Sequence, residues 1–389
     1  MNFNRRQLLA TGTAGLALAS GLGAARASGV TDSEIVIGTH LDLSGPTAAG
    51  MPMLRNAMEM RINEANAAGG IHGRQIRLIV EDNGSQPQLA VRAMQKLIRQ
   101  DEVFAILNPF GSGTNAATLG IALEEGVPIF APWGASAIFQ QVAGNHPLLF
   151  TTVQDYHTTT GRALMRVIPE WGSQRVGVIY MEGPFGDLIQ AGVNAAMEEL
   201  GMSVADSAAY RPGDIDFSSQ VARLRASNCD LIVIGTIIRE TVGVMQAVRN
   251  LNWDVNVLTG IPGRGTIVAA LGGEDVEGLY GIGGWQLHGE DTEDADAQAF
   301  ISGFQEAYGM VPDENAANSY SYTSWFIAAL EAAGPELNAD SFAEAARATR
   351  HQDFTTYTEL GFENNHAMPE PVSVDQIQGG RWVALDDPF

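Results

Sequence analysis

The sequence predicts an α/β protein of two doubly wound lobes, each a parallel sheet with helices on both faces. Two observations lead to this prediction. Short, near-continuous apolar runs, which suit strands buried on both faces of a sheet, alternate along the chain with segments of helical period. The alternation begins again near residue 175, which predicts a second sheet with its own crossover helices.

The first set of elements covers residues 34–130. In its first helix Leu54, Met58 and Ile62 recur at helical spacing, and Gly69 and Gly70 should end that helix because glycine accepts the left-handed cap conformation. Pro87 suits the first turn of the second helix. Strands are expected at residues 34–38, 74–82, 103–107 and 127–130, and helices at 54–65, 87–97 and 114–125.

The second set repeats the pattern over residues 175–259. Strands are expected at 175–181, 202–210, 230–235 and 255–259, and helices at 188–200, 217–226 and 241–250. After residue 278 the helical segments 300–308, 320–334 and 341–349 have few strands beside them. We expect these segments to complete the two lobes rather than to form a third.

Residues 1–27 are expected to be an export signal. Arg5 and Arg6 precede an apolar run over residues 8–22, which is shorter than the roughly 20 residues that span a bilayer. Small residues at Ala25 and Ala27 suit cleavage near Ala27. The arginine pair is typical of a twin-arginine signal, with an ordinary Sec signal as the alternative. The mature protein should therefore be exported and soluble.

Composition argues against several classes of function. The 22 basic against 45 acidic residues give a formal net charge of −23, which argues against a nucleic-acid partner because phosphate binding needs basic surface. Cys229 is the only cysteine, which excludes an intramolecular disulfide. None of the seven histidines forms a His-x-x-x-His pair, and no phosphate-binding glycine motif is present. We expect no metal and no cofactor.

A hydrolase using His40, Asp42 or Ser112 is an alternative from another functional class. Such an enzyme needs a base within hydrogen-bond reach of a nucleophile. No spacing in the sequence indicates that pair, so the chain is not expected to be an enzyme.

Three segments carry a resemblance to a known family. Residues 62–74 read Ile-Asn-Glu-Ala-Asn-Ala-Ala-Gly-Gly-Ile-His-Gly-Arg, with Leu-Ser-Gly-Pro before them at 43–46 and Val-Glu-Asp-Asn after them at 80–83. The chain resembles type I periplasmic solute-binding proteins of the branched-chain amino acid (leucine/isoleucine/valine-binding) class over nearly all of residues 34–385.

The resemblance implies two lobes joined by a hinge of three crossings. The first lobe would be residues 34–153 plus 284–355, and the second 156–282 plus 356–389. It also implies a monomer that traps a small amino acid, or a related small carboxylate or amide, in the periplasm and delivers it to the membrane permease of an ABC importer. A ligand-sensing subunit of a signalling receptor on the same fold is the alternative.

The resemblance also implies ligand-binding residues in two loops of the first lobe. Phe110, Gly111 and Ser112 match the loop whose serine and backbone amides hold a ligand carboxylate, although Ser112 could equally be only an N-cap. Trp133, Gly134 and Ser136 match the second loop, where the tryptophan could cover an apolar ligand or pack within the lobe.

In the second lobe, Phe185, Ile237 and Ile238 match apolar walls of the family's pocket. Tyr320 matches a family tyrosine and suits the core as well as the cleft. Family members that bind amino acids carry a glutamate after the strand at 255–259, where this chain has Arg264 nearby and no acid. Because a buried ammonium without an anionic partner is costly, Arg264 makes a ligand carboxylate a better fit than an α-amino group.

Overall fold

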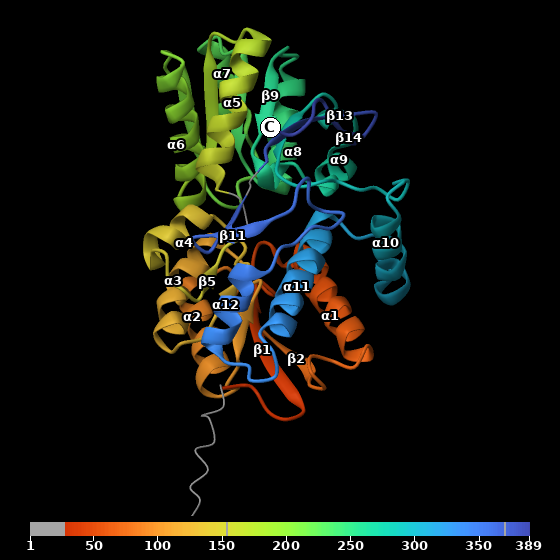
Figure 1. Ribbon diagram of the computed structural model, residues 1–389. Helices are drawn as coiled ribbons and strands as arrows, with labels where there is room; N and C mark the ends of the chain where they lie inside the picture. The colour runs from red at the N-terminus through yellow and green to blue at the C-terminus, as the bar shows by residue number, and fades with distance from the viewer. Residues whose placement is uncertain (1–27, 153–154, 369–370) are drawn as a thin grey trace, which may run out of the picture.

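The computed structural model describes residues 28–152, 155–368 and 371–389, which form two α/β lobes, the first below the second in Figure 1. The expected export signal, residues 1–27, lies outside the described residues. Both central sheets are built mainly from parallel strands, so the predicted fold class is confirmed.

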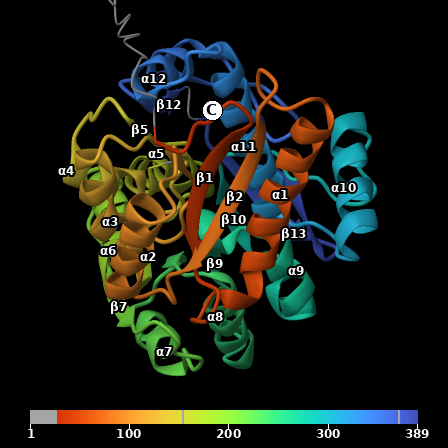
Figure 2. The same ribbon diagram turned by 90° about the horizontal axis from the view of Figure 1, so that it is seen from below.

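The first lobe has a parallel sheet in the order β2-β1-β3-β4-β5. Helices α1 and α11 lie on one side of it and α2 and α3 on the other (Figure 2). The strands are β1 (Glu34–Leu41), β2 (Gln75–Asp82), β3 (Ala105–Leu107), β4 (Ile129–Phe130) and β5 (Leu149–Phe150). The helices are α1 (Met51–Ala67), α2 (Pro87–Arg99), α3 (Ser112–Glu124), α4 (Ser136–Ala143), α10 (Ala295–Tyr308), α11 (Glu314–Ala332) and α12 (Ala339–Ala348).

The second lobe has a sheet in the order β14-β13-β10-β9-β8-β6-β7, in which β13 and β14 are antiparallel additions. Its strands are β6 (Val176–Met181), β7 (Asp206–Tyr210), β8 (Leu231–Gly235), β9 (Asn256–Thr259), β10 (Tyr280–Gly283), β13 (Ser373–Gln378) and β14 (Arg381–Ala384). Its helices are α5 (Tyr156–Trp171), α6 (Pro184–Glu199), α7 (Ser218–Ala226), α8 (Ile238–Asn250) and α9 (Thr266–Gly272).

The end of α1 forms as its sequence predicts. Gly69 and Gly70 have φ values of +114° and +69°, and the Gly70 amide donates to the Ala65 carbonyl at 2.9 Å. This turn sends the chain directly into β2, which pairs in parallel with β1 from Glu34 opposite Gln75 onward. Residues 62–74, which carry the resemblance, therefore contain the end of α1 and the turn that leads into β2.

The chain passes between the lobes after β5, after β10 and after the hairpin of β11 (Gly361–Glu363) and β12 (His366–Met368). This hairpin packs on the first lobe: the Phe362 ring stacks on Trp325 with centroids 4.2 Å apart, and Thr151 Oγ1 lies 2.6 Å from His366 Nδ1. The sequence placed residues 356–389 in the second lobe, whereas the structure leaves only the chain from β13 onward there. Burial of Phe362 in the aromatic core decides the difference.

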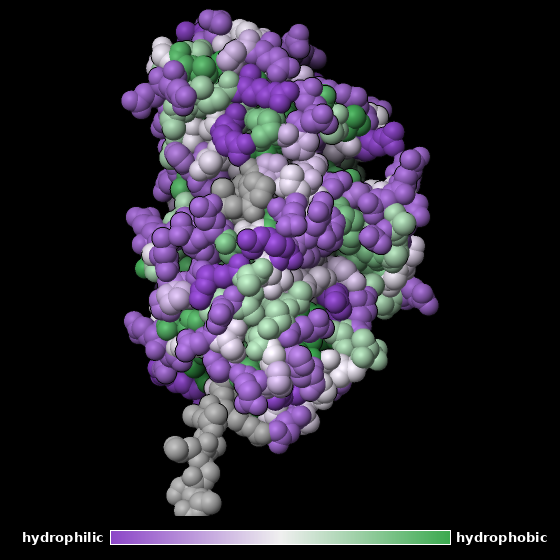
Figure 3. Space-filling view, viewed as in Figure 1, coloured by the Kyte–Doolittle hydropathy of each residue, from purple (hydrophilic) through white to green (hydrophobic). Residues whose placement is uncertain are grey.

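The surface in Figure 3 is mostly hydrophilic, with apolar residues scattered in small patches. Inside the first lobe the core is aromatic, and the Phe130 ring has Phe326, Phe362 and Trp325 within 6 Å of its centroid (5.5, 5.6 and 5.9 Å). One buried cluster includes side chains of both lobes, from Trp133 in the first to Phe185 and Ile189 in the second. The lobes are therefore packed against each other beside the crossings.

Candidate functional site

The loops that follow β3 and β4 form one hydrogen-bonded unit at the carboxyl edge of the first sheet. The Gly111 amide donates to the Trp133 carbonyl at 3.0 Å, and the Trp133 amide donates to the Pro109 carbonyl at 2.8 Å. The Ala135 amide donates to Ser112 Oγ at 3.0 Å. The structure therefore brings together the six residues predicted for the first lobe: Phe110, Gly111, Ser112, Trp133, Gly134 and Ser136.

The serines of this unit each begin a helix. Gly111 occupies the N-cap position of α3, so Ser112 is the first helical residue and not the N-cap that the sequence allowed. Ser136 is the first residue of α4 and is fully buried, and its Oγ has no hydrogen-bond partner among the described residues. Both helices therefore point their amino ends, which favour acceptor groups, toward the same edge of the sheet.

Gly134 allows the close approach of the two loops. It has a φ of +136°, and a Cβ there would lie 2.8 Å from the amide nitrogen and from Oγ of Ser112. These contacts are shorter than real Cβ atoms make, and the backbone conformation itself disfavours other residues.

We therefore expect Gly134→Ala to lower the free energy of unfolding by about 1–3 kcal/mol, because both strained backbone and steric overlap are introduced. Urea denaturation, monitored by circular dichroism, measures the change in the free energy of unfolding. Gly113→Ala is the matched control, since a Cβ at that helical position meets nothing within 4 Å. Equal behaviour of the two variants would contradict the prediction.

Three predicted residues of the second lobe stand at helix amino ends, just after β6 and β8. Phe185 is in the first turn of α6, and its ring meets Tyr156 edge-on with centroids 5.4 Å apart. Ile237 is the N-cap of α8 and Ile238 its first residue, and both are half-buried. Ligands of open α/β sheets sit at such strand–helix junctions.

Arg264 does not present its guanidinium to a ligand. The side chain is buried against β10, where a Cβ at Gly281 or Gly283 would collide with it, and it forms an ion pair with Asp375 of β13. Its Nη1 donates to the Trp285 carbonyl at 3.0 Å. This corrects the sequence interpretation, because the carboxylate that Arg264 binds belongs to the protein itself.

Tyr320 also lies away from the other predicted residues. Its hydroxyl donates to Glu64 Oε2 of α1 at 2.6 Å, and its ring lies 5.0 Å from the ring of Phe300 in α10. Tyr320 therefore packs where α1, α10 and α11 meet. Residues two apart on a helix point about 200° apart. Tyr322 is accordingly the tyrosine beside the predicted site, with its ring 5.9 Å from Trp133.

A small cavity of about 30 Å³ lies beside the crossings. It is lined by Thr152, Gly284, Trp285, Asn318, Tyr322, Thr355, Thr356, Tyr357, Leu360, Ala367 and Pro371. The sequence prediction missed these residues. Two signals were present: Asn318 and Tyr322 share one face of a helix, and Trp285 follows a strand that carries glycines at alternate positions, Gly281 and Gly283.

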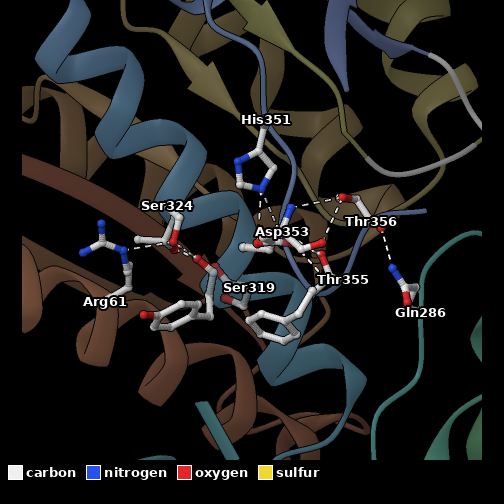
Figure 4. Close-up of polar contacts among 12 residues, drawn as sticks. Arg61, Gln286, Ser319, Ser324, His351, Asp353, Thr355 and Thr356 are labelled. Carbon is white, nitrogen blue, oxygen red and sulfur yellow. Dashed lines mark hydrogen bonds and ion pairs between the residues drawn. The ribbon is translucent and has the colours of Figure 1, made fainter. Parts of the chain in front are cut away.

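A polar network includes Thr355 and Thr356 of the cavity lining (Figure 4). Gln286 Nε2 donates to the Thr356 carbonyl at 2.6 Å, joining the chain after β10 to the segment that leads to β11. Burial alone would raise the pKa of Asp353, but hydrogen bonds, first from His351, hold it below its usual range. Ser321 Oγ and Asp353 Oδ2 both approach His351 Nε2, at 2.9 and 3.2 Å, whereas a hydrolase triad uses opposite ring nitrogens.

The residues considered for hydrolysis have separate structural roles. Burial lowers the pKa of His40 to about 4, and its Nδ1 lies 3.0 Å from Asn83 Nδ2. Asp42 accepts hydrogen bonds from the amide and the hydroxyl of Thr47 at 2.8 and 2.6 Å. Across residues 28–152, 155–368 and 371–389, no helix is long and apolar enough to cross a membrane, and no cluster of metal-ligating side chains is placed to hold an ion.

Two α/β lobes, three crossings between them and an aromatic-lined cavity beside the crossings define a two-lobed binding protein, a class that takes up small molecules between its lobes. More particularly, the chain belongs to the periplasmic binding protein family, whose model matches residues 34–381. The resemblance seen in the sequence is thereby confirmed, and the family is one of binding proteins rather than enzymes.

Comparisons with individual proteins agree with this family. The chain is 25% identical over 324 residues to a leucine-, isoleucine-, valine-, threonine- and alanine-binding protein of Pseudomonas aeruginosa, covering 82% of this chain and 83% of that one. A fatty acid ABC transporter substrate-binding protein from Thermomonospora curvata superposes with a TM-score of 0.83 at 21% identity, covering 94% of each chain. An ABC transporter solute-binding protein from R. palustris in complex with benzoate gives 0.80 at 19% identity, covering 92% and 98%.

Proposed function

We propose that this protein is the solute-binding component of an ABC importer and holds a small solute between its two lobes. The observation that carries the proposal is that side chains of both lobes belong to one buried apolar cluster. It includes the ring pair of Trp133 and Tyr322 from the first lobe and that of Tyr156 and Phe185 from the second. Relatives and structural neighbours that are named as amino-acid-, fatty-acid- or benzoate-binding proteins support this role.

Nine of the predicted residues remain in the proposed site. Six belong to the loop unit of the first lobe and three to the helix amino ends of the second: Phe110, Gly111, Ser112, Trp133, Gly134, Ser136, Phe185, Ile237 and Ile238. Closure of the lobes would bring the two groups onto one solute. The same proposal includes export to the periplasm with cleavage near Ala27, action as a monomer and delivery to a membrane permease.

A thermal-shift screen of the chain from Ser28 tests this function. The panel contains amino acids, aliphatic amides and aliphatic and aromatic carboxylates. A solute present at about 100 times its dissociation constant should add about 2.7 kcal/mol of stability, and so raise the melting temperature by a few degrees. Chromatography of the incubated solute shows whether it is chemically converted, and conversion would contradict a transport role. A complete absence of shifts in melting temperature would also contradict it.

A further inference from the structure

Several buried polar groups around the cavity have no hydrogen-bond partner among the described residues. Thr152 Oγ1, Trp285 Nε1 and Asn318 Nδ2 belong to residues that line the cavity and are only 5%, 8% and 2% exposed. Trp133 Nε1 is also without a partner, and its ring lies beside Tyr322, which lines the cavity too. Leaving such groups unpaired is costly in a folded protein, so their concentration at one place indicates a group that pairs with them when it is bound.

The chemistry of these groups specifies that partner. An indole N–H and an amide NH₂ can only donate, and a threonine hydroxyl can donate as well. Trp285, Asn318 and Thr152 therefore bring unpaired donors to the lining of one cavity and call for a ligand group with several acceptor positions. A carboxylate, with two oxygens and about four lone-pair sites, satisfies this set. An ammonium group, which only donates, can pair with the Thr152 hydroxyl oxygen but with neither the indole N–H nor the amide NH₂.

The acids near the cavity each have a partner within the protein. Asp375 Oδ2 is paired with Arg264, whose Nη2 also reaches Tyr357 of the lining, and Asp375 Oδ1 has no hydrogen-bond partner among the described residues. Asp353, two residues before Thr355 of the lining, accepts a hydrogen bond from the Thr355 hydroxyl at 2.7 Å. A solute ammonium buried here would have to share the single charge of Asp375 with Arg264 or displace one of these pairs.

Glu314, one turn before Asn318 on α11, is also occupied. Its Oε2 accepts hydrogen bonds from the amide and hydroxyl of Thr266 at 2.9 and 2.8 Å. Beside the polar residues Thr355, Thr356 and Tyr357, the lining has apolar walls from Leu360, Ala367 and the rings of Trp285 and Tyr322. These walls suit a hydrophobic solute body, with the acceptor group at the donors.

We propose that the solute is a monocarboxylate with an aromatic or branched apolar body and no amino group, and that its carboxylate is held by Trp285 Nε1, Asn318 Nδ2 and Thr152 Oγ1. The proposal deepens the proposed function and rests on it. The 30 Å³ cavity accepts the carboxylate end, and the larger solute body enters as the lobes part toward Trp133. The proposed solute thus lacks the α-amino group of an amino acid, which the unpaired indole N–H and amide NH₂ of the cavity lining cannot bind.

Calorimetric titration with matched solutes tests the proposal. 3-Phenylpropanoate is compared with phenylalanine, and 4-methylpentanoate with leucine, so that each pair differs by the α-amino group alone. We expect the amine-free acid to bind at least tenfold more tightly in one pair or both. Equal or tighter binding of the amino acid would overturn this inference and leave the transport role intact. Failure of both acids to bind would also overturn this inference. The transport role would still be tested separately, by whether any solute of the broader thermal-shift screen raises the melting temperature.

Two variants test whether the solute carboxylate binds at the named donors. Asn318→Leu and Thr152→Val should each weaken binding of the amine-free acid at least tenfold, without lowering the melting temperature of the unliganded protein, because each removes an unpaired buried polar group. Thr39→Val is the matched control: Thr39 is fully buried on β1, its Oγ1 also lacks a partner in the described part of the chain, and it is not among the residues that line the cavity. Unchanged affinity in Asn318→Leu and Thr152→Val would overturn the assignment.

Discussion

Asp375→Ala is expected to lower the free energy of unfolding by about 3–5 kcal/mol, because it leaves the Arg264 guanidinium buried without its counter-charge. Both side chains are only 2% exposed. Arg264 cannot move to water easily, since it is packed against the backbone of β10 at Gly281 and Gly283. The pair also joins β13, the first strand after the third crossing, to the loop after β9.

Guanidinium denaturation of Asp375→Ala and of Asp291→Ala measures this effect against a control. Asp291 pairs with Arg381 at 2.9 Å, but these side chains are 75% and 71% exposed, so its loss should cost less than about 1 kcal/mol. The double replacement Arg264→Met with Asp375→Leu should recover most of the lost stability, because no buried charge remains. A cost for Asp375→Ala no larger than that for Asp291→Ala would show that Arg264 finds water or another partner.

The second large effect concerns Glu314, which connects the lobes. Glu314 begins α11 of the first lobe and caps α9 of the second through the amide and hydroxyl of Thr266. The approach is so close that a Cβ at Gly265 would lie 2.5 Å from Glu314 Oε1. Burial, together with the charge of Asp313, raises the pKa of Glu314 to about 7.

The direction of the pH dependence follows from that raised pKa. When the lobes part, Glu314 meets water and its pKa falls toward the ordinary value of 4.5. The closed form therefore holds the proton more tightly, and the stability that this proton gives to closure is lost as the pH rises from about 4.5 through about 7. Since the solute binds the closed form, its affinity should fall by roughly tenfold between about pH 5.5 and 8.

Calorimetric titration across this pH range, with a solute found in the screen, checks the prediction. Glu314→Gln keeps the acceptor oxygen and cannot ionise, so its affinity should be high and nearly independent of pH. Asp294→Asn is the control, since the Asp294 side chain caps α10 by accepting from the amides of Asp296 and Ala297, both within the first lobe. A pH profile of Glu314→Gln that matches the unmodified protein would contradict the role of Glu314 in closure.

Local patterns account for the part of the fold that the sequence predicted. The β-branched run at Leu231–Gly235 has few alternatives to a buried strand, and Gly69 and Gly70 can end α1 whatever packs around them. The unit of Phe110 to Ser112 and Trp133 to Ser136 was also predictable, because loops at the carboxyl ends of neighbouring parallel strands must meet. The resemblance identified the family from such segments alone.

Long-range contacts decided the rest. Arg264 is 111 positions from Asp375, and nothing near either residue indicates that their charges cancel in the interior. Tyr320 and Tyr322 are equivalent in a sequence pattern until the packing of α11 directs one toward Glu64 and the other toward Trp133.

The sequence by itself determined the two-lobed α/β architecture, the family and the loops of the first lobe, because these follow from short-range periodicity, glycine geometry and strand order. Only the tertiary structure decided that Arg264 pairs with Asp375, on which lobe the β11–β12 hairpin packs, and that Trp285, Asn318 and Thr152, which carry unpaired donors, line one cavity. The physical reason is that burial and pairing depend on side chains brought together from distant segments, and these set the chemistry of the site.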